Sequence, residues 1–344
     1  MALTPSQLKL FLAQSIAARL PVLITGAPGI AKSEVVAQAC VLAGAGHIIT
    51  NPAVEDPTVV QGFPWPQAES ETATFLPFGA LARALKATTL TVWNVEDLGQ
   101  ASPAMQAAYM QLFLARRVNG HVLPDCIVFI ATTNRRTDKA GVSGLLEPIK
   151  SRFAAIVELE PDLDDWCTWA LSNGVDAMSV AFLRFRPELL SDFQPSADLT
   201  QSPSPRTWYN ASRLFALDLP ENILREALIG CVGESAACER LGFEKLYKSL
   251  PSIDAIMIDP DSALIPSEPA ALYATATALA ARANVSTFAN IARYCERLHT
   301  ALHGEFAALI LRDCIRRDPA ICQTPAFVSL VSSPLGSLIS GQVN

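Results

Sequence analysis

The most constraining feature of the sequence is a short apolar run that ends in a loop rich in glycine and proline. The run Val22–Ile24 stops before Gly26, and the loop leads into a segment with helical character. Strand, loop and helix in this order are the setting of a phosphate-binding loop, whose backbone N–H groups face an anion at the helix N-terminus. The pattern predicts a nucleoside triphosphate site formed by Gly26, Ala27, Pro28, Gly29, Ile30, Ala31, Lys32 and Ser33.

Two side chains of this loop have predicted roles. Lys32 is expected to reach the β- and γ-phosphates, and the Ser33 hydroxyl to bind Mg²⁺. The position before the lysine is Ala31, where the general pattern has glycine. An alanine there costs roughly 1 kcal/mol if the backbone needs a positive φ and nothing if φ is negative. A chance match is the alternative interpretation, which the preceding strand and following helix disfavour.

The composition excludes several other classes of protein. The 344 residues are enough for about two domains. A net charge of −7 disfavours broad nucleic-acid binding, which needs a basic face. No apolar run is long enough for a membrane span and no signal-peptide pattern is present, so we expect a cytoplasmic protein. The eight cysteines are scattered without a Cys-x-x-Cys pair, which makes a zinc site improbable.

The first half of the sequence alternates short apolar runs with segments of helical periodicity. Strands that alternate with helices indicate a parallel sheet covered on both faces, so residues 1–160 are predicted to be an α/β domain with a five-stranded parallel sheet. The predicted strands are Val22–Thr25, His47–Thr50, Thr91–Val95, Ile127–Thr133 and Ala155–Leu159. The predicted helices are Pro5–Ala18, Ser33–Ala43, Pro77–Lys86 and Pro103–Ala115.

Strand patterns fade after Glu160, and helical periodicity continues from there. The looser stretch Ile253–Glu268, with its prolines and acids, indicates a boundary. We therefore predict a helical domain of residues 161–252 and a helical C-terminal region of residues 253–344. The predicted helices are Leu163–Ser172, Val175–Phe185, Pro205–Ala216, Glu221–Gly233, Cys238–Ser249, Pro269–Ala283, Thr287–Leu302 and Glu305–Arg316.

A second candidate motif is the strand Thr91–Val95, which is followed by the carboxylates Glu96 and Asp97. A phosphate-loop ATPase needs one acid for Mg²⁺ and its water shell and another to orient or deprotonate the attacking water. By position, Glu96 is expected to face the metal and Asp97 to act on the water. Such sites usually have Asp first and Glu second, so the shorter Asp97 predicts slow hydrolysis. A solvated turn at the strand end is the alternative.

Three more polar residues are candidates by position. Asn134 ends the strand Ile127–Thr133, where its amide can hold the attacking water beside the γ-phosphate, although a turn-forming asparagine is equally compatible. Arg152 is placed to reach a neighbouring subunit's γ-phosphate, unless it only caps a helix. Arg206 begins a helix of the second domain, and alone it indicates little.

Together, these motifs resemble the AAA+ ATPases, and among them the MoxR-like (dynein-related) group in its bacterial and phage-type subgroup. The resemblance covers roughly residues 15–215. It implies a Walker A motif at Gly26–Ser33, a Walker B motif at Val92–Asp97, sensor 1 at Asn134, an arginine finger at Arg152 and sensor 2 at Arg206. It also implies an insert at Val60–Phe78 and a hairpin at Arg117–Leu123, where Asn119-Gly120 is a strong turn signal.

The resemblance implies a P-loop AAA+ fold and an ATPase that forms a homo-oligomeric ring, expected to be a hexamer. Mg²⁺ would be held by Ser33 and Glu96, and the inserted loops would contact a client protein. The family analogy suggests a von Willebrand factor A-type client. The alternatives are a nucleotide-dependent scaffold with little or no turnover and a DNA-handling motor. Small basic groups motivate the second alternative: Arg116, Arg117, Arg135, Arg136 and Lys139.

Overall fold

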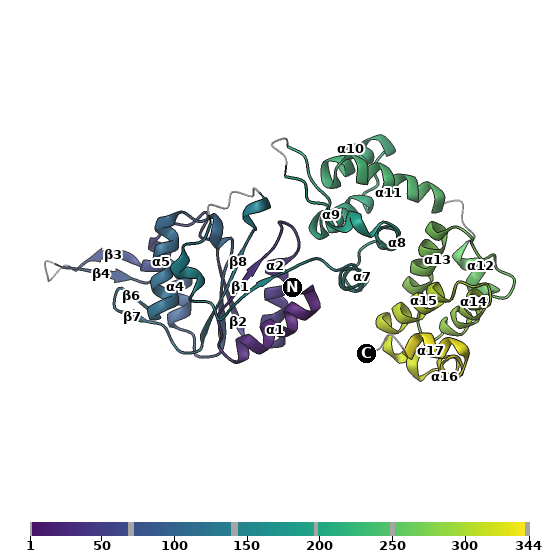
Figure 1. Cartoon of the computed structure of the whole chain (residues 1–344), viewed down its shortest axis with the longest axis horizontal. Helices are drawn as coiled ribbons and strands as arrows, with labels where there is room; N and C mark the ends of the chain where they lie inside the picture. The colour runs from purple at the N-terminus through teal and green to yellow at the C-terminus, as the bar shows by residue number, and fades with distance from the viewer. Residues whose placement is uncertain (1, 68–71, 139–143, 196–198, 248–251, 341–344) are drawn as a thin grey trace. The chain divides into compact units, whose positions relative to one another are not determined.

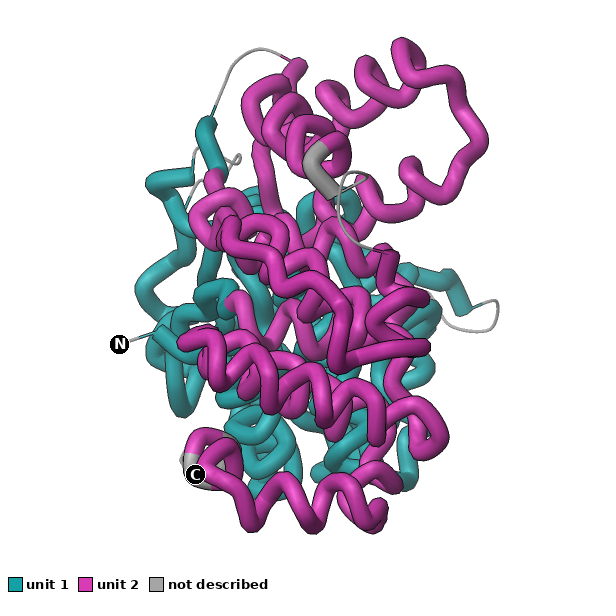
Figure 2. The backbone as a smooth tube through the Cα atoms, turned by 90° about the vertical axis from the view of Figure 1, so that its right-hand side faces the viewer, with its two compact units in different colours: residues 1–162, 193–197 teal, residues 163–192, 198–344 magenta. Residues whose placement is uncertain are grey.

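The computed structural model describes residues 2–67, 72–138, 144–195, 199–247 and 252–340. The chain forms two compact units, shown in teal and magenta in Figure 2. The first contains residues 1–162 and 193–197, and the second contains residues 163–192 and 198–344. The described part of the first unit is α/β, and that of the second is helical (Figure 1). Lys139, one of the basic residues named in the sequence analysis, lies outside the described residues.

The first unit is built on a five-stranded parallel sheet with the strand order β2-β5-β8-β1-β9. All five predicted strands are confirmed to within one residue at each end, and with them the predicted fold class. The central strand β8 is buried along its whole length, as expected for a parallel sheet covered on both faces. The strands are β1 (Val22–Thr25), β2 (Gly46–Thr50), β5 (Thr91–Val95), β8 (Ile127–Thr133) and β9 (Ala155–Glu158).

Two apolar cores flank this sheet, because successive side chains of a strand point to opposite faces. In β1, Val22 and Ile24 pack in one core and Leu23 packs in the other. The first core lies against helices α1 (Pro5–Ala17) and α2 (Lys32–Leu42). The second lies against α4 (Gly79–Leu85) and α5 (Pro103–Ala115). Shorter elements are α3 (Thr58–Gln61), η1 (Leu98–Gln100), η2 (Arg136–Asp138) and α6 (Glu147–Lys150).

Two hairpins project from the first unit. The predicted hairpin is confirmed as β6 (Arg117–Val118) and β7 (His121–Val122), joined by Asn119 and Gly120 at φ 45° and 85°. The insert that follows β2 contains a second antiparallel pair, β3 (Phe63–Pro66) and β4 (Ala73–Leu76), which the sequence analysis did not identify as strands. The two hairpins are linked, because His121 Nε2 lies 2.8 Å from the Phe75 carbonyl oxygen.

The second unit is entirely helical in its described residues, and the predicted helices are present with ends shifted by up to four residues. The stretch after residue 252 is more ordered than expected, since it contains a short helix, and three further short elements follow residue 318. The elements are α7 (Leu163–Ser172), α8 (Ala177–Phe185), η3 (Pro187–Leu190), α9 (Pro205–Phe215), α10 (Glu221–Val232), α11 (Glu234–Tyr247), α12 (Ile253–Ile258), α13 (Pro269–Ala281), α14 (Phe288–Thr300), α15 (Gly304–Arg317), η4 (Pro319–Gln323), α16 (Pro325–Val331) and α17 (Pro334–Ser340).

Buried charges connect the helices of the second unit. Arg184 of α8 forms an ion pair with Asp313 of α15 at 2.6 Å, and both side chains are almost fully buried. The same guanidinium donates a hydrogen bond to Thr277 of α13. These contacts join helices from both sides of residue 252 in one compact unit. A separate domain border at that residue stays a prediction.

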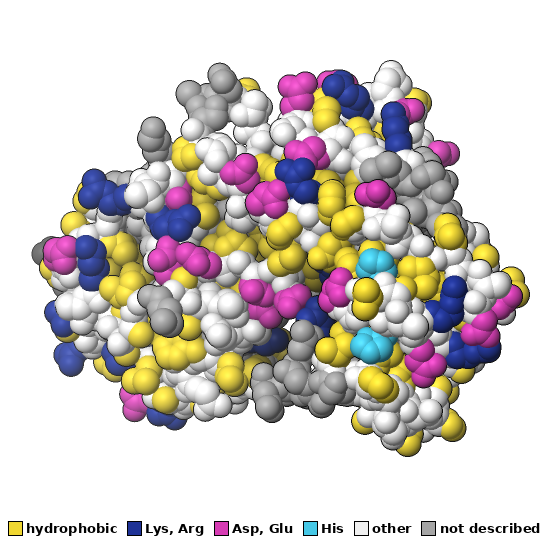
Figure 3. All heavy atoms as spheres, turned by 45° about the vertical axis from the view of Figure 1, so that its right-hand side comes forward, with side chains coloured by type: hydrophobic (Ala, Val, Ile, Leu, Met, Phe, Trp, Pro, Cys, Tyr) yellow, Lys and Arg dark blue, Asp and Glu magenta, His cyan; other side chains and the backbone are white. Residues whose placement is uncertain are grey.

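The surface of the chain carries charges of both signs. On the face drawn in Figure 3, Lys and Arg side chains are scattered, and many lie beside Asp or Glu. None of the helices in the described ranges has the length and apolar character needed to cross a membrane.

Candidate nucleotide-binding site

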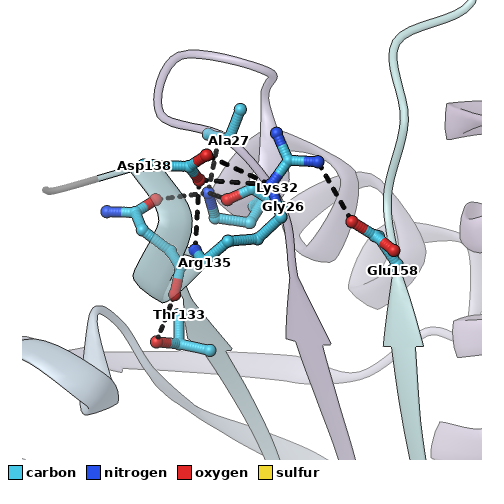
Figure 4. A network of polar contacts seen from close by, with 8 residues as sticks. Gly26, Ala27, Lys32, Thr133, Arg135, Asp138 and Glu158 are labelled. Atoms are coloured by element: carbon cyan, nitrogen blue, oxygen red, sulfur yellow. Dashed lines mark hydrogen bonds and ion pairs between the residues drawn. The ribbon is translucent and has the colours of Figure 1, made fainter. Parts of the chain in front are cut away.

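The predicted phosphate-binding loop lies between β1 and α2, at the carboxyl edge of the parallel sheet. Lys32 is the first residue of α2, and its side chain folds back under the loop. Its Nζ donates hydrogen bonds to the carbonyl oxygens of Gly26 and Ala27, each at 2.8 Å (Figure 4). These bonds shape the loop around the lysine, which is only 8% exposed.

The start of α2 is suited to bind an anion. The N-cap residue Ala31 has no side chain that can accept hydrogen bonds from the N–H groups of the first helical turn. These N–H groups can therefore donate to a bound anion. Ala31 has φ 72°, in the left-handed region. The free-energy cost that was expected for a positive φ at this position therefore applies. Ala31 destabilises the loop by about 1 kcal/mol relative to glycine.

The first residue of the loop leaves no room for a side chain. A Cβ atom on Gly26 would lie 2.6 Å from Ile30 Cδ1 and 2.8 Å from the carbonyl oxygen of Leu159, which follows β9. Both distances are shorter than real Cβ contacts. Glycine is therefore required here by the close approach of the loop to the end of β9.

The sheet brings Asn134 to the same loop. Thr25 at the end of β1 pairs with Thr133 at the end of β8, so the residue that follows Thr133 lies beside the residue that follows Thr25. Asn134 Oδ1 accepts a hydrogen bond from Lys32 Nζ at 2.7 Å. Asn134 is itself 8% exposed. Two candidate residues that are 102 positions apart in sequence are thus in direct contact.

The two predicted acids follow β5, which is separated from β1 by β8. The backbone of Glu96 continues the pairing with β2, because its N–H donates to Thr50 O at 2.8 Å. Asp97 instead turns toward β8, and its N–H lies 3.4 Å from Thr132 Oγ1. Asp97 has φ 54°, in the left-handed region, which aspartate adopts more readily than most side chains but less readily than glycine. Strain of this kind is often found at functional sites.

The chemistry of this edge suits the predicted Mg²⁺. This ion takes oxygen ligands, usually one or two from side chains and the rest from water and phosphates. Ser33, in the first turn of α2, supplies a hydroxyl, and Glu96 supplies a carboxylate that accepts a hydrogen bond from Asn94. Within the described ranges, no group of three or more His, Cys, Asp or Glu side chains is placed to hold a metal ion.

The two predicted arginines lie elsewhere. Arg152 follows α6 and precedes Ala154, whose N–H donates to Pro21 O at the amino end of β1. Lys32 lies beyond the carboxyl end of that strand, so the two residues lie at opposite ends of β1, which is about 13 Å long. Arg206 belongs to the second unit, where it is exposed in the first turn of α9. Ser204 and Thr207 form the capping box that starts this helix.

Arg135 is a charged residue of the site that was predicted from the sequence as part of a basic group, with a contact to an adjoining subunit as the alternative, and was not named as a site residue. Its Nε and backbone N–H bond to the buried carboxylate of Asp138, and its Nη1 lies 3.1 Å from Glu158 Oε1 (Figure 4). Burial lowers the pKa of this guanidinium, but the two carboxylates outweigh that effect and raise the pKa above its usual value. Arg135 and Glu158 each lie at the end of a predicted strand, and this position was the available signal in the sequence. That the two strand ends lie close enough for an ion pair depends on the strand order, which local patterns do not give.

Comparisons with known proteins give only a general likeness. No protein-family model matches the sequence, and no curated protein matches it. Among solved structures, the RuvB Holliday junction branch migration motor of Thermotoga maritima is similar with a TM-score of 0.40 and 13% identity, over 80% of this chain and 81% of that chain. NtrX from Brucella abortus in complex with ADP is similar with a TM-score of 0.42 and 15% identity, over 88% of this chain and 68% of that chain. Both scores are below 0.5, so we base the function on the site itself.

Proposed function

We propose that this protein is an AAA+ ATPase that binds and hydrolyses ATP at the carboxyl edge of its parallel sheet. The observation that carries the proposal is the contact between Lys32 and Asn134, which joins the phosphate-binding loop to a polar strand end across β1 and β8. A phosphate group seated on the loop would lie beside both side chains. The acids Glu96 and Asp97 follow the next strand of the same edge.

Each residue has one proposed task in hydrolysis. Lys32 and the N–H groups of the loop bind the β- and γ-phosphates, while Ser33 and Glu96 would hold Mg²⁺. Asn134 orients a water molecule, and Asp97 accepts its proton. The water oxygen forms a bond to the γ-phosphorus while the bond from that phosphorus to the β–γ bridging oxygen breaks. When bound at this site, Mg²⁺ would neutralise charge that develops on the phosphate oxygens.

The location of Arg152 supports an assembly in which neighbouring subunits complete each other's sites. The backbone of Arg152 lies near the amino edge of the sheet. Its Nε is buried without a hydrogen-bond partner among the described residues. We propose that it acts on the nucleotide of an adjacent copy in a ring. For Arg206 we propose the sensor 2 role that the family resemblance implies. A hexamer is the expected ring size by family resemblance.

The two hairpins support the proposal of a protein client. Apolar side chains on them are exposed, including Phe63, Trp65 and Val122 at 52%, 54% and 66%. Exposed apolar surface of this kind is typical of protein interaction sites. A remodelling activity on a client, with a von Willebrand factor A-type protein as the example suggested by resemblance, is part of the proposed function.

Two observations favour a slow or inactive scaffold as the second candidate. Asp97 is a short acid on a strained backbone, and Ala31 occupies a left-handed position of the phosphate-binding loop. A DNA motor has less support, since Arg116 and Arg135 of the basic groups bind backbone carbonyls and carboxylates of this chain. DNA-stimulated turnover that weakens steeply with salt would favour it.

The proposal is tested by ATP hydrolysis with Mg²⁺ across a range of protein concentrations. Activity per subunit should rise with concentration, because a neighbour completes each site. Lys32→Ala and Arg152→Ala should each be inactive, but a mixture of the two should recover activity through interfaces that combine an intact Lys32 with an intact Arg152. Lys86→Ala and Arg83→Ala, which alter exposed residues of the same unit, are matched controls.

The outcomes separate the candidates. Nucleotide binding without turnover at any concentration would favour the scaffold. Full activity of Arg152→Ala alone would show that the proposed action on a neighbouring subunit is wrong.

A further inference from the structure

Arg135 crosses the strand that leads into the phosphate-binding loop. Its backbone follows β8, and its guanidinium reaches Glu158 at the end of β9. The strand β1 lies between those two strands in the sheet, and Thr25 pairs with Thr133 on one side and with Glu158 on the other. The Arg135–Glu158 ion pair therefore bridges two strand spacings, about 10 Å in total, where β1 ends before Gly26 (Figure 4).

The same residue fixes the segment that contains Asn134. The N–H of Arg135 donates to Asp138 Oδ2, and its Nε donates to both oxygens of that carboxylate. On the other side, the Thr133 hydroxyl donates to the carbonyl oxygen of Asn134. Asn134 is thus held at both flanks, with its amide oxygen directed to Lys32.

We propose that Arg135 is a positioning residue, whose bridge from Asp138 to Glu158 holds the Asn134 amide where it distinguishes a nucleoside triphosphate from a diphosphate. This inference rests on the proposed function, because it assumes that the loop binds ATP. Asn134 lies beside the end of Lys32, which is where a terminal phosphate is expected. A diphosphate lacks the group that Asn134 contacts, so a shifted Asn134 affects only triphosphate binding.

Glu158 is the better residue to change. Removal of Arg135 would leave Asp138, whose side chain is 7% exposed, as a buried carboxylate without its cation, and the fold could fail. Glu158 is 38% exposed, so its truncation releases one end of the bridge and leaves the Arg135–Asp138 pair intact. Glu160, two residues further on and exposed, gives a control with the same change of charge.

The experiment compares affinities for ADP and for a non-hydrolysable ATP analogue, both with Mg²⁺, by titration calorimetry of the full chain. Glu158→Ala should weaken binding of the ATP analogue about fivefold, as expected for the net loss of one hydrogen-bonded contact, and leave ADP binding unchanged. Arg135→Lys, which keeps the charge but cannot fork to both carboxylates, should shift the same ratio. Glu160→Ala should bind both nucleotides like the wild type.

Equal weakening of both nucleotides in Glu158→Ala would indicate a merely structural bridge and overturn the inference, as would an unchanged ratio. These results leave the proposed function standing. A wild-type protein that binds neither nucleotide would overturn the proposed function itself, so the two failures are distinguishable.

Discussion

The two units bury cations in different ways. In the first unit, Lys32 donates to two backbone carbonyls and one amide oxygen. In the second unit, Arg184 is paired with Asp313, and Arg240 is paired with Asp176. A neutral acceptor of Lys32 can be exchanged for a phosphate oxygen without stranding a charge. The arginines cannot release their partners without leaving a buried carboxylate or guanidinium uncompensated. The three acceptors of Lys32 are therefore suited to exchange with a ligand, as the proposed function requires, whereas the two arginine pairs are structural contacts.

Backbone strain occurs in both units, because Leu302 in the second unit also has a positive φ, at 66°. Ala31 and Asp97, two of the non-glycine residues with positive φ, lie at the candidate site of the first unit. Such positions cost free energy and persist where the surrounding structure imposes them. The comparison predicts that substitutions at the site change activity more than stability, and that substitutions of the buried pairs do the reverse.

The largest expected effect is that of Asp97→Gly. Loss of the proposed general base should lower ATP turnover about 100- to 10,000-fold, while relief of the left-handed strain should raise the free energy of unfolding by up to about 1 kcal/mol. Asp125→Gly is the control, because Asp125 is exposed and its φ is not positive, so glycine there should only destabilise. ATP turnover measures the loss of activity, and urea unfolding measures the gain in stability. Unaltered turnover would remove Asp97 from the mechanism.

The second prediction concerns the buried pair of the helical unit. Asp313→Ala leaves the Arg184 guanidinium buried without its partner, so the free energy of unfolding should fall by about 3–5 kcal/mol. Urea unfolding of this variant is compared with that of Asp218→Ala, which alters an exposed aspartate and should change stability by less than about 0.5 kcal/mol. Equal stability of the two variants would contradict the structural role of the pair.

The third prediction concerns Lys32, the buried cation of the first unit. Lys32→Met keeps the length of the side chain but removes its charge, so ATP affinity should fall by about 1.5–3 kcal/mol, or roughly 10- to 150-fold. The free energy of unfolding should fall by less than in Asp313→Ala, since the three hydrogen-bond acceptors, two carbonyl groups and one amide, are not left as unpaired charges. Titration with ATP, with Lys86→Met as the control, gives the measurement. A large loss of stability with unaltered affinity would reverse the comparison.

The smallest expected effect is that of Ala31→Gly. Glycine adopts the left-handed conformation without strain, but it loses more entropy on folding, so the net gain in unfolding free energy should be about 0.5–1 kcal/mol. The same substitution at Ala37, in the interior of α2, should lower stability by about 0.5–1 kcal/mol. Thermal unfolding of the two variants should therefore shift in opposite directions. Destabilisation by both would show that residue 31 does not need a positive φ.

The fold of the first unit could be predicted closely because its signals are local. Apolar runs of strand length alternate with helical periods, and the hairpin at residues 117–122 is marked by Asn119-Gly120. The β3–β4 hairpin escaped prediction because Pro64 and Pro66 lie in the β3 strand, where proline usually argues against a strand. Its aromatic residues alternate with these prolines, and this period of two was the available signal.

The sequence by itself determined the strands, the phosphate-binding loop and the polar residues at the strand ends, since each depends on neighbours within a few positions. Only the tertiary structure decided the contacts between them. The strand order places β8 and β9 on either side of β1, which brings Asn134 to Lys32 and carries Arg135 across to Glu158. The tertiary structure also decided the positive φ of Ala31 and the pairing of Arg184 with Asp313. Contacts over long sequence separations depend on how whole elements pack, and no local pattern specifies that.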